Sequence, residues 1–184
     1  VHGIRQLISG RIFKIPQTKL RVICDNMGGG FGTKGGCYPE YSLALWASEV
    51  TGGAVKWMAE RSESLLTDEQ ARGGLVDAEI AFDAEYKITG LRTHTKVPIG
   101  AYYTNDRNMG CATSGLGGLA GVYDIPAIHA RVTGGLTNMM TNAQYRGGAK
   151  PEPVYVLEVI IDVAARTLGI SPVELRRRNT LPAS

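Results

Sequence analysis

Glycine is unevenly distributed along this chain, and its clusters limit the possible folds more than any other feature. The 184 residues include 24 glycines, gathered at 28–36, 114–121 and 134–148. Glycine adopts positive φ readily, and because it has no Cβ it lets another group come close to the backbone. Glycine also weakens the interior of helices and strands. We therefore expect tight turns at these clusters, of the kind from which a backbone-built binding site is made.

The segments around the first glycine cluster predict an alternation of extended and helical structure. Residues 19–24 are short and apolar, which favours a strand, and residues 54–58 predict another. Between them, the pattern after Pro39 is that of a helix ended by Gly52. One face of that helix would carry Leu43, Trp46, Ala47 and Val50. The expected order is strand, glycine loop, helix, strand.

The second half of the chain predicts a hairpin, a long loop and two helices. Residues 75–82 alternate apolar and polar side chains, as a half-buried strand does, and 83–90 turn into a second strand. Residues 100–121 lack periodicity and are interpreted as a loop. Apolar residues at helical spacing fill 151–168, and a capping box with Pro at the first position predicts a second helix from Ser171. The fold class is α+β, a mixed sheet with packed helices, and no linker marks a domain boundary.

Charge and hydropathy exclude two classes of protein. The net charge is only +3, and the basic run Arg176–Arg178 is interpreted as the solvated face of a short helix rather than a nucleic-acid contact. No apolar run approaches the roughly 20 residues that a helix needs to cross a bilayer, so we expect no membrane insertion.

Cysteine and histidine do not form a metal-binding pattern. Three cysteines, Cys24, Cys37 and Cys111, lie far apart in the sequence and without a C-x-x-C spacing. An odd number argues against a disulfide framework and favours a reducing compartment, so we expect a cytoplasmic protein. The histidines, His2, His94 and His129, are interpreted as structural residues.

The first glycine cluster matches a dinucleotide fingerprint literally. Gly30, Gly32 and Gly35 have the G-x-G-x-x-G spacing between an expected strand and an expected helix. Pro39, however, separates them from the helix, and no acidic residue ends the next expected strand. A nicotinamide-dependent oxidoreductase and a ligand-free tight turn both remain open on this motif alone.

A second candidate binding motif precedes the long helix. Arg146 is followed by Gly147 and Gly148 shortly before the helix starts at Pro151. Exposed N–H groups, the positive end of the helix dipole and a guanidinium fork together suit an anion. The same residues would also serve as an ordinary loop-to-helix turn.

Taken together, these segments resemble the molybdopterin-binding large subunit of the xanthine dehydrogenase, aldehyde oxidase and carbon monoxide dehydrogenase family. The family pattern is G-G-G-F-G-x-K, V-K-W-x-x-x-R-x-E, then Y-R-G-x-G-x-P-E before a helix ending in L-R-x-x-N. The chain has GGGFGTK, VKWMAERSE, YRGGAKPE and LRRRN in that order. The resemblance implies that residues 1–184 are a fragment of the molybdenum cofactor-binding domain, and the start at Val1 rather than Met fits that expectation.

The resemblance also implies a chemistry. In this family a molybdenum centre held by a pterin dithiolene hydroxylates an aldehyde or an activated ring carbon with oxygen from water, and the protein orients the reactants. Phe31 would line the substrate pocket. The cofactor-binding residues carried over by motif position are Gly29, Gly30, Phe31, Gly32, Arg146 and Gly147.

Departures from the family pattern narrow the range of expected substrates. Xanthine dehydrogenases have a Glu where this chain has Gly35 and an Arg where it has Ser114, so purine recognition is not expected. Carbon monoxide dehydrogenases have a copper-binding Cys where this chain has Gly147. An aldehyde or an N-heterocycle remains as the substrate. Lys150 replaces the commoner Arg, which removes a bidentate phosphate contact.

No catalytic residue is expected within these residues. The family's general-base Glu belongs to a downstream G-x-G-E segment, and Glu40, Glu49 and Glu152 are interpreted as helix-start or surface carboxylates. The fragment alone should therefore be inactive. The resemblance implies molybdopterin, in its cytosine dinucleotide form, with molybdenum, and partner subunits that carry 2Fe-2S clusters and FAD. The alternative from another class is a non-catalytic, stand-alone binding or scaffold domain.

Overall fold

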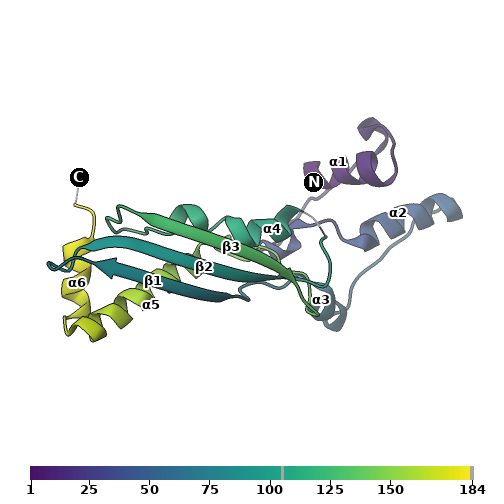
Figure 1. Cartoon of the computed structure of the whole chain (residues 1–184). Helices are drawn as coiled ribbons and strands as arrows, with labels where there is room; N and C mark the ends of the chain where they lie inside the picture. Colours follow the sequence, from purple (N-terminus) through teal and green to yellow (C-terminus); the bar gives the residue numbers. More distant parts are fainter. Residues whose placement is uncertain (105, 183–184) are drawn as a thin grey trace. The chain divides into compact units, whose positions relative to one another are not determined.

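A computed structural model describes residues 1–104 and 106–182 of the chain. The chain divides into two compact units, Val1–Asp68 and Glu69–Ser184. Figure 1 shows helices in the first unit and a sheet with packed helices in the second.

The first unit is built from helices and turns. It contains no strand among the residues that the structure describes. Its elements are α1 (His2–Leu7), a π-helix (Ile8–Ile12), 3₁₀ turns at Gln17–Lys19 and Thr33–Gly35, α2 (Pro39–Thr51) and α3 (Arg61–Thr67).

Helix α2 confirms the helix predicted after Pro39. Proline occupies its first turn, where the missing N–H costs no intrahelical bond, and Gly52 ends it in the left-handed conformation at φ 65°. Its apolar face is not buried within the unit, because Leu43, Trp46 and Val50 are 58%, 56% and 66% exposed. This helix therefore owes its boundaries to local signals rather than to a core.

The two strands predicted at 19–24 and 54–58 are wrong. Both segments are irregular, and their apolar side chains lie largely in solvent: Ile23 is 62% and Met58 78% exposed. A strand exists only where a neighbour accepts and donates its backbone hydrogen bonds. No strand of the described chain pairs with either segment, so apolar composition alone did not make them strands.

The second unit contains a three-stranded mixed sheet. Its order is β1 (Leu75–Phe82), β2 (Ile88–Gly100) and β3 (Ile128–Leu136). β1 pairs antiparallel with β2, whereas β2 pairs parallel with β3. The α+β class with a mixed sheet and packed helices is thereby confirmed.

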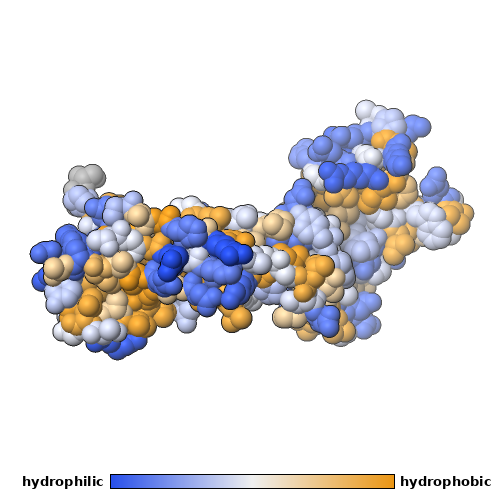
Figure 2. Space-filling model, in the orientation of Figure 1, coloured by the Kyte–Doolittle hydropathy of each residue, from blue (hydrophilic) through white to orange (hydrophobic). Residues whose placement is uncertain are grey.

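The β1–β2 hairpin follows from the alternation seen in the sequence. Its outward face carries the ion pairs Asp77–Lys96, at 2.9 Å, and Glu79–Arg92. Figure 2 shows a patch of hydrophilic side chains over the middle of the sheet. The inward face of β1 is half-buried at Val76, Ala78, Ile80 and Phe82.

Helix α5 (Pro151–Leu168) contributes more residues to the core cluster than any other element. Its residues Leu157, Ile161 and Ala165 lie on one stripe and are at most 2% exposed. The core cluster consists of Ile88, Leu91, Tyr123, Leu157, Ile161, Ala165 and Leu175. Each fully buried Leu or Ile contributes about 2 kcal/mol of hydrophobic stabilisation. Among the described residues, no helix is long and apolar enough to cross a bilayer.

Helix α6 (Pro172–Asn179) explains the L-R-x-x-N pattern as structural. Leu175 enters the core, and Arg176 joins α5 through Glu158 and Asp162 at 2.8 and 2.7 Å. The buried Asn179 side chain accepts from the Ile88 N–H at 2.7 Å and donates to the carbonyls of Tyr86 and Leu175 at 2.9 Å each. One side chain thus joins the turn of the hairpin to α6.

The capping box predicted at Ser171 does not form. Ser171 is the N-cap, but its side chain makes no capping hydrogen bond. The Glu174 carboxylate instead accepts from Arg178 Nε at 2.9 Å, one helical turn further on. A capping box forms at Glu60–Glu63 at the start of α3, which the sequence did not single out.

The long loop predicted at 100–121 is also wrong. It contains α4 (Asp106–Thr113) and a 3₁₀ turn at Leu116–Gly118. Helices α4 and α5 cover the same face of the sheet (Figure 1). Asn108 is fully buried, and its side chain donates to the Asn142 carbonyl at 2.7 Å, so tertiary contacts rather than periodicity stabilise α4.

We predict that Asn179→Ala lowers the free energy of unfolding by about 3 kcal/mol. The substitution leaves buried hydrogen-bonding groups of the backbone without their partner. Urea unfolding followed by circular dichroism measures the change. Arg177→Ala on the exposed face of α6 is the control, and an equal loss in both variants would contradict the role assigned to Asn179.

Candidate cofactor-binding site

The first glycine cluster folds into a tight turn. Phe31 and Gly32 both have positive φ, at 49° and 97°. The Lys34 N–H donates to the Gly30 carbonyl and the Gly35 N–H to the Gly32 carbonyl, each at 3.1 Å. The chain therefore reverses within a few residues, and the backbone itself forms the surface of the turn.

Two kinds of glycine occur in this turn. A Cβ at Gly29 would lie 2.4 Å from two carbons of the Phe31 ring, so the ring lies across the backbone there. A Cβ at Gly28 or Gly30 would meet no atom within 4 Å. The Phe31 ring requires a glycine at position 29, whereas Gly28 and Gly30 leave open space beside backbone amides. That space fits a bulky ligand that approaches the main chain.

The turn does not have the surroundings of a dinucleotide site. The segment before it is not a strand, and α2 begins only at Pro39, after the turn has ended. A dinucleotide fingerprint needs a strand, the glycine turn and a helix N-terminus in direct succession. The literal G-x-G-x-x-G match therefore lacks its structural context.

The second glycine cluster folds into another turn, immediately before α5. Gly147, Gly148 and Ala149 have φ of 104°, 57° and 62°. The Gly148 N–H donates to the Tyr145 carbonyl at 2.8 Å, and the Lys150 N–H to the Gly147 carbonyl at 3.2 Å. A Cβ at Gly147 would lie 2.6 Å from Pro151 Cγ. Only glycine satisfies both the dihedral angle and the packing at this position.

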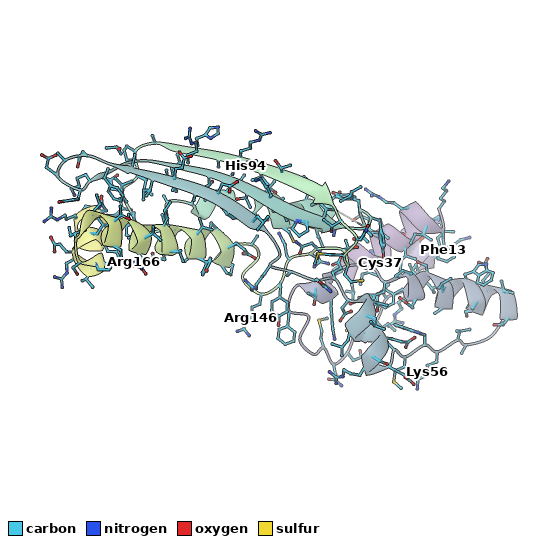
Figure 3. All side chains as sticks on the ribbon, turned by 60° about the horizontal axis from the view of Figure 1, so that its bottom comes forward. Phe13, Cys37, Lys56, His94, Arg146 and Arg166 are labelled. Atoms are coloured by element: carbon cyan, nitrogen blue, oxygen red, sulfur yellow. The ribbon has the colours of Figure 1, made fainter. Side chains whose placement is uncertain are left out.

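This turn presents positive partial charge. Lys150 is the N-cap of α5 and makes no side-chain capping bond, and the Gly147 N–H has no partner among the described residues. Figure 3 shows Arg146 just before α5 and Arg166 near the opposite end of that helix. Backbone donors, the helix dipole and a guanidinium are therefore available to an anionic group.

An apolar groove adjoins the second turn. It has a volume of about 640 Å³ and lies between the inner face of β1 and β2 and the exposed side of α5. Arg72, Gln144, Tyr145 and Glu152 line its polar part. Its apolar part includes Val76, Ala78, Val97, Val156, Val159 and Val163.

A polar network supports the chain that leads into this turn. Arg107 pairs with Glu69 at 3.0 Å, and the Thr104 hydroxyl donates to the same carboxylate at 3.0 Å. The Gln70 N–H donates to the Thr141 carbonyl at 3.0 Å. Sequence reasoning did not find these residues, because nothing in their spacing indicates that they meet.

Arg72 is a further residue that the sequence analysis missed. Its guanidinium donates to the Arg146 carbonyl, stands 5.6 Å from the centre of the Tyr145 ring and lies 3.8 Å from the Glu152 carboxylate. Its backbone has a φ of 64°. A bulky residue beside two glycines, at Gly73 and Gly74, was the signal that could have identified it.

The residues carried over from the family pattern belong to both units. Gly29, Gly30, Phe31 and Gly32 share the turn of the first unit. Arg146 and Gly147 share the turn of the second unit. Both turns are rich in glycine and contain residues with positive φ, the kind of backbone from which main-chain sites for anionic ligands are built.

Comparisons with known proteins show which family the chain belongs to. A family model described as the molybdopterin cofactor-binding domain matches residues 1–180. The carbon monoxide dehydrogenase large chain of Hydrogenophaga pseudoflava is 37% identical over 97% of this chain and 22% of its own length. The 6-hydroxypseudooxynicotine dehydrogenase complex subunit gamma of Paenarthrobacter nicotinovorans is 33% identical over 100% of this chain and 23% of its own.

A solved structure supports the same relationship. The reconstituted CO dehydrogenase from Oligotropha carboxidovorans matches with a TM-score of 0.90 and 33% identity, over 98% of this chain and 22% of that one. The chain thus spans less than a quarter of the length of these relatives. It belongs to the family of molybdopterin cofactor-binding domains.

We predict that Gly147→Ala is more damaging than Gly148→Ala. Both positions have positive φ, which costs an L-residue about 1–2 kcal/mol, but only Gly147 also meets Pro151 at a clashing distance. The expected loss in the free energy of unfolding is about 1 kcal/mol at Gly148 and at least about 2 kcal/mol at Gly147. Urea unfolding measures both, and equal losses would contradict the packing argument.

We predict that Cys111 reacts slowly with iodoacetamide. Burial, followed by the negative charges of Glu152 and Glu69, raises the pKa of its thiol to about 11. At pH 8 only about one molecule in a thousand would carry the reactive thiolate. In a variant with Cys24→Ser and Cys37→Ser, alkylation should be about a hundredfold slower than in the same protein unfolded in urea. Equal rates would show an accessible, unshifted thiol.

Proposed function

We propose that this chain forms part of the cofactor-binding wall of a molybdenum hydroxylase large subunit that oxidises an aldehyde or an N-heterocycle. The match of residues 1–180 to the molybdopterin cofactor-binding family carries the proposal. The open glycine turn and the exposed donors before α5 fit an anionic pterin cofactor. When bound, that cofactor supplies the redox chemistry that adds water-derived oxygen to the substrate.

The first turn would hold the cofactor through its main chain. Gly29, Gly30, Phe31 and Gly32 provide amides on a turn whose shape is fixed by its own hydrogen bonds. Such donors lose little entropy on binding, because they are already ordered. The Phe31 ring is 52% exposed and would form an apolar wall for the substrate.

The second turn would contact an anionic group of the cofactor through Arg146 and Gly147. The Gly147 N–H and the positive end of the α5 dipole favour negatively charged groups. Glu152 is paired with Arg72, and Glu40 stands in the first turn of α2. Neither carboxylate nor Glu49 is proposed as a general base, which would come from another part of the subunit.

The proposed class of substrate follows from the residues at three positions. Gly35 and Ser114 lack the carboxylate and guanidinium that the family uses for purines, and Gly147 lacks the thiolate that carbon monoxide dehydrogenases use for copper. The similarity to a carbon monoxide dehydrogenase therefore extends to the fold and not to that ligand. A 6-hydroxypseudooxynicotine dehydrogenase among the relatives supports an organic substrate.

The remaining parts of the enzyme are proposals by relationship. The names of two relatives, a large chain and the gamma subunit of a complex, support a multi-subunit enzyme. We propose partner subunits that carry 2Fe-2S clusters and FAD, and the cytosine dinucleotide form of molybdopterin. The cysteines Cys24, Cys37 and Cys111 are free, which supports a reducing compartment such as the cytoplasm.

The test is an isotope experiment on the full-length protein purified with its neighbouring subunits. A panel of aldehydes and N-heterocycles is oxidised in oxygen-18 water with a dye as electron acceptor, alongside xanthine and carbon monoxide. We expect oxygen-18 in the product from at least one aldehyde or heterocycle and no turnover of xanthine or carbon monoxide. Product oxygen drawn from O₂, or oxidation of xanthine or carbon monoxide alone, would contradict the proposal.

A further inference from the structure

Arg72 occupies a backbone conformation that is costly for its type. Its φ of 64° lies in the left-handed region, which disfavours residues with a Cβ by about 1–2 kcal/mol. The neighbouring chain holds it there. The Gln70 N–H donates to the Thr141 carbonyl at 3.0 Å, and the Ala143 N–H donates to the Gln70 carbonyl at 2.7 Å. The segment before Arg72 is therefore joined to the chain that leads into the Arg146–Gly147 turn.

The Arg72 guanidinium interacts with three groups in and beside the turn. It donates to the Arg146 carbonyl, lies over the Tyr145 ring at 5.6 Å and approaches Glu152 in the first turn of α5 at 3.8 Å. The Arg72 and Glu152 side chains are 38% and 39% exposed, so solvent weakens their ion pair. The contact with the carbonyl is the directional one, and no other donor in the described chain reaches that oxygen.

The contact with the Arg146 carbonyl helps to fix where the Gly147 N–H points. A trans peptide is planar, with its C=O and N–H directed oppositely. No cis peptide occurs in the described residues. A guanidinium that holds the oxygen on one side therefore aims the hydrogen to the other side. The Gly147 N–H has no partner among the described residues, so no acceptor there helps to orient it, and the Arg72 contact adds to the hydrogen bonds of the turn itself.

We propose that Arg72 is a positioning residue that aims the Gly147 N–H at the bound cofactor by holding the Arg146–Gly147 peptide from behind. This inference rests on the proposed function, because it needs a cofactor at Gly147. A lysine would keep the positive charge but would lose the planar fork that bonds the carbonyl and covers the Tyr145 ring. Arg72 itself need not touch the cofactor, since its contacts are directed to the turn.

The test is Arg72→Gly in the full-length holoprotein. Glycine removes the guanidinium and at the same time relieves the strained φ, so the fold is spared while the positioning contact is lost. Arg166→Met, at an exposed site near the other end of α5, is the matched control (Figure 3). The readouts are the rate at which molybdenum and pterin leave the protein in the presence of a chelator, and the melting temperature of the cofactor-free protein.

We expect Arg72→Gly to lose molybdenum and pterin about tenfold faster than the wild type, the loss that corresponds to about one charge-assisted hydrogen bond. The cofactor-free variant should melt within a few degrees of the control. Millimolar guanidinium should slow the loss in Arg72→Gly and leave the wild type and Arg166→Met unchanged. Arg72→Lys should fall between the wild type and Arg72→Gly.

Other outcomes separate the two proposals. Unchanged retention in Arg72→Gly overturns the role of Arg72 and leaves the proposed function standing. Faster loss with a strongly lowered melting temperature of the cofactor-free protein, and with no rescue by guanidinium, would assign Arg72 to general folding and also overturn the inference. A folded wild-type protein without molybdenum and pterin would instead contradict the proposed function.

Discussion

The packing of α5 against the inner face of the β1–β2 hairpin is the interaction on which the second unit depends. Leu157, Ile161 and Ala165 bury one stripe of the helix on the core that contains Ile88 and Leu91. The same packing fixes the position of the first turn of α5, and with it the Arg146–Gly147 turn that precedes it. Helix α6 reinforces this arrangement, because Asn179 joins the hairpin turn to α6 and Arg176 joins α6 to α5.

In the two glycine turns, the absence of a side chain has a different effect at different positions. Gly147 is required by its own dihedral angle and by the nearby Pro151, so it maintains the shape of the turn. Gly30 meets nothing within its unit, so what it provides is access to the backbone. A large anionic cofactor needs both properties, because ordered amides recognise its charge only if nothing stands between them and the ligand. In the second turn, Arg72 holds the peptide that carries the Gly147 N–H.

Elements encoded by local patterns could be predicted from the sequence, and elements stabilised by distant contacts could not. Helix α5 and strand β1 carry the periods of 3.6 and 2, so they were found. Helix α4 is polar and depends on the contact between Asn108 and Asn142, and β3 is almost entirely exposed and so shows no alternation. The glycine turns of the site were found because glycine clusters are visible in a sequence. Arg72 was missed because its partners Tyr145, Arg146 and Glu152 are more than seventy residues away along the chain.

Elemental mass spectrometry of the full-length protein tests most directly whether these turns belong to a molybdopterin site. The protein is purified with its neighbouring subunits, and molybdenum is measured per large subunit together with the fluorescence of the released pterin. We predict about one molybdenum and one pterin for each large subunit. A correctly folded protein that contains neither would contradict the account, and a binding or scaffold domain would then explain the fold better.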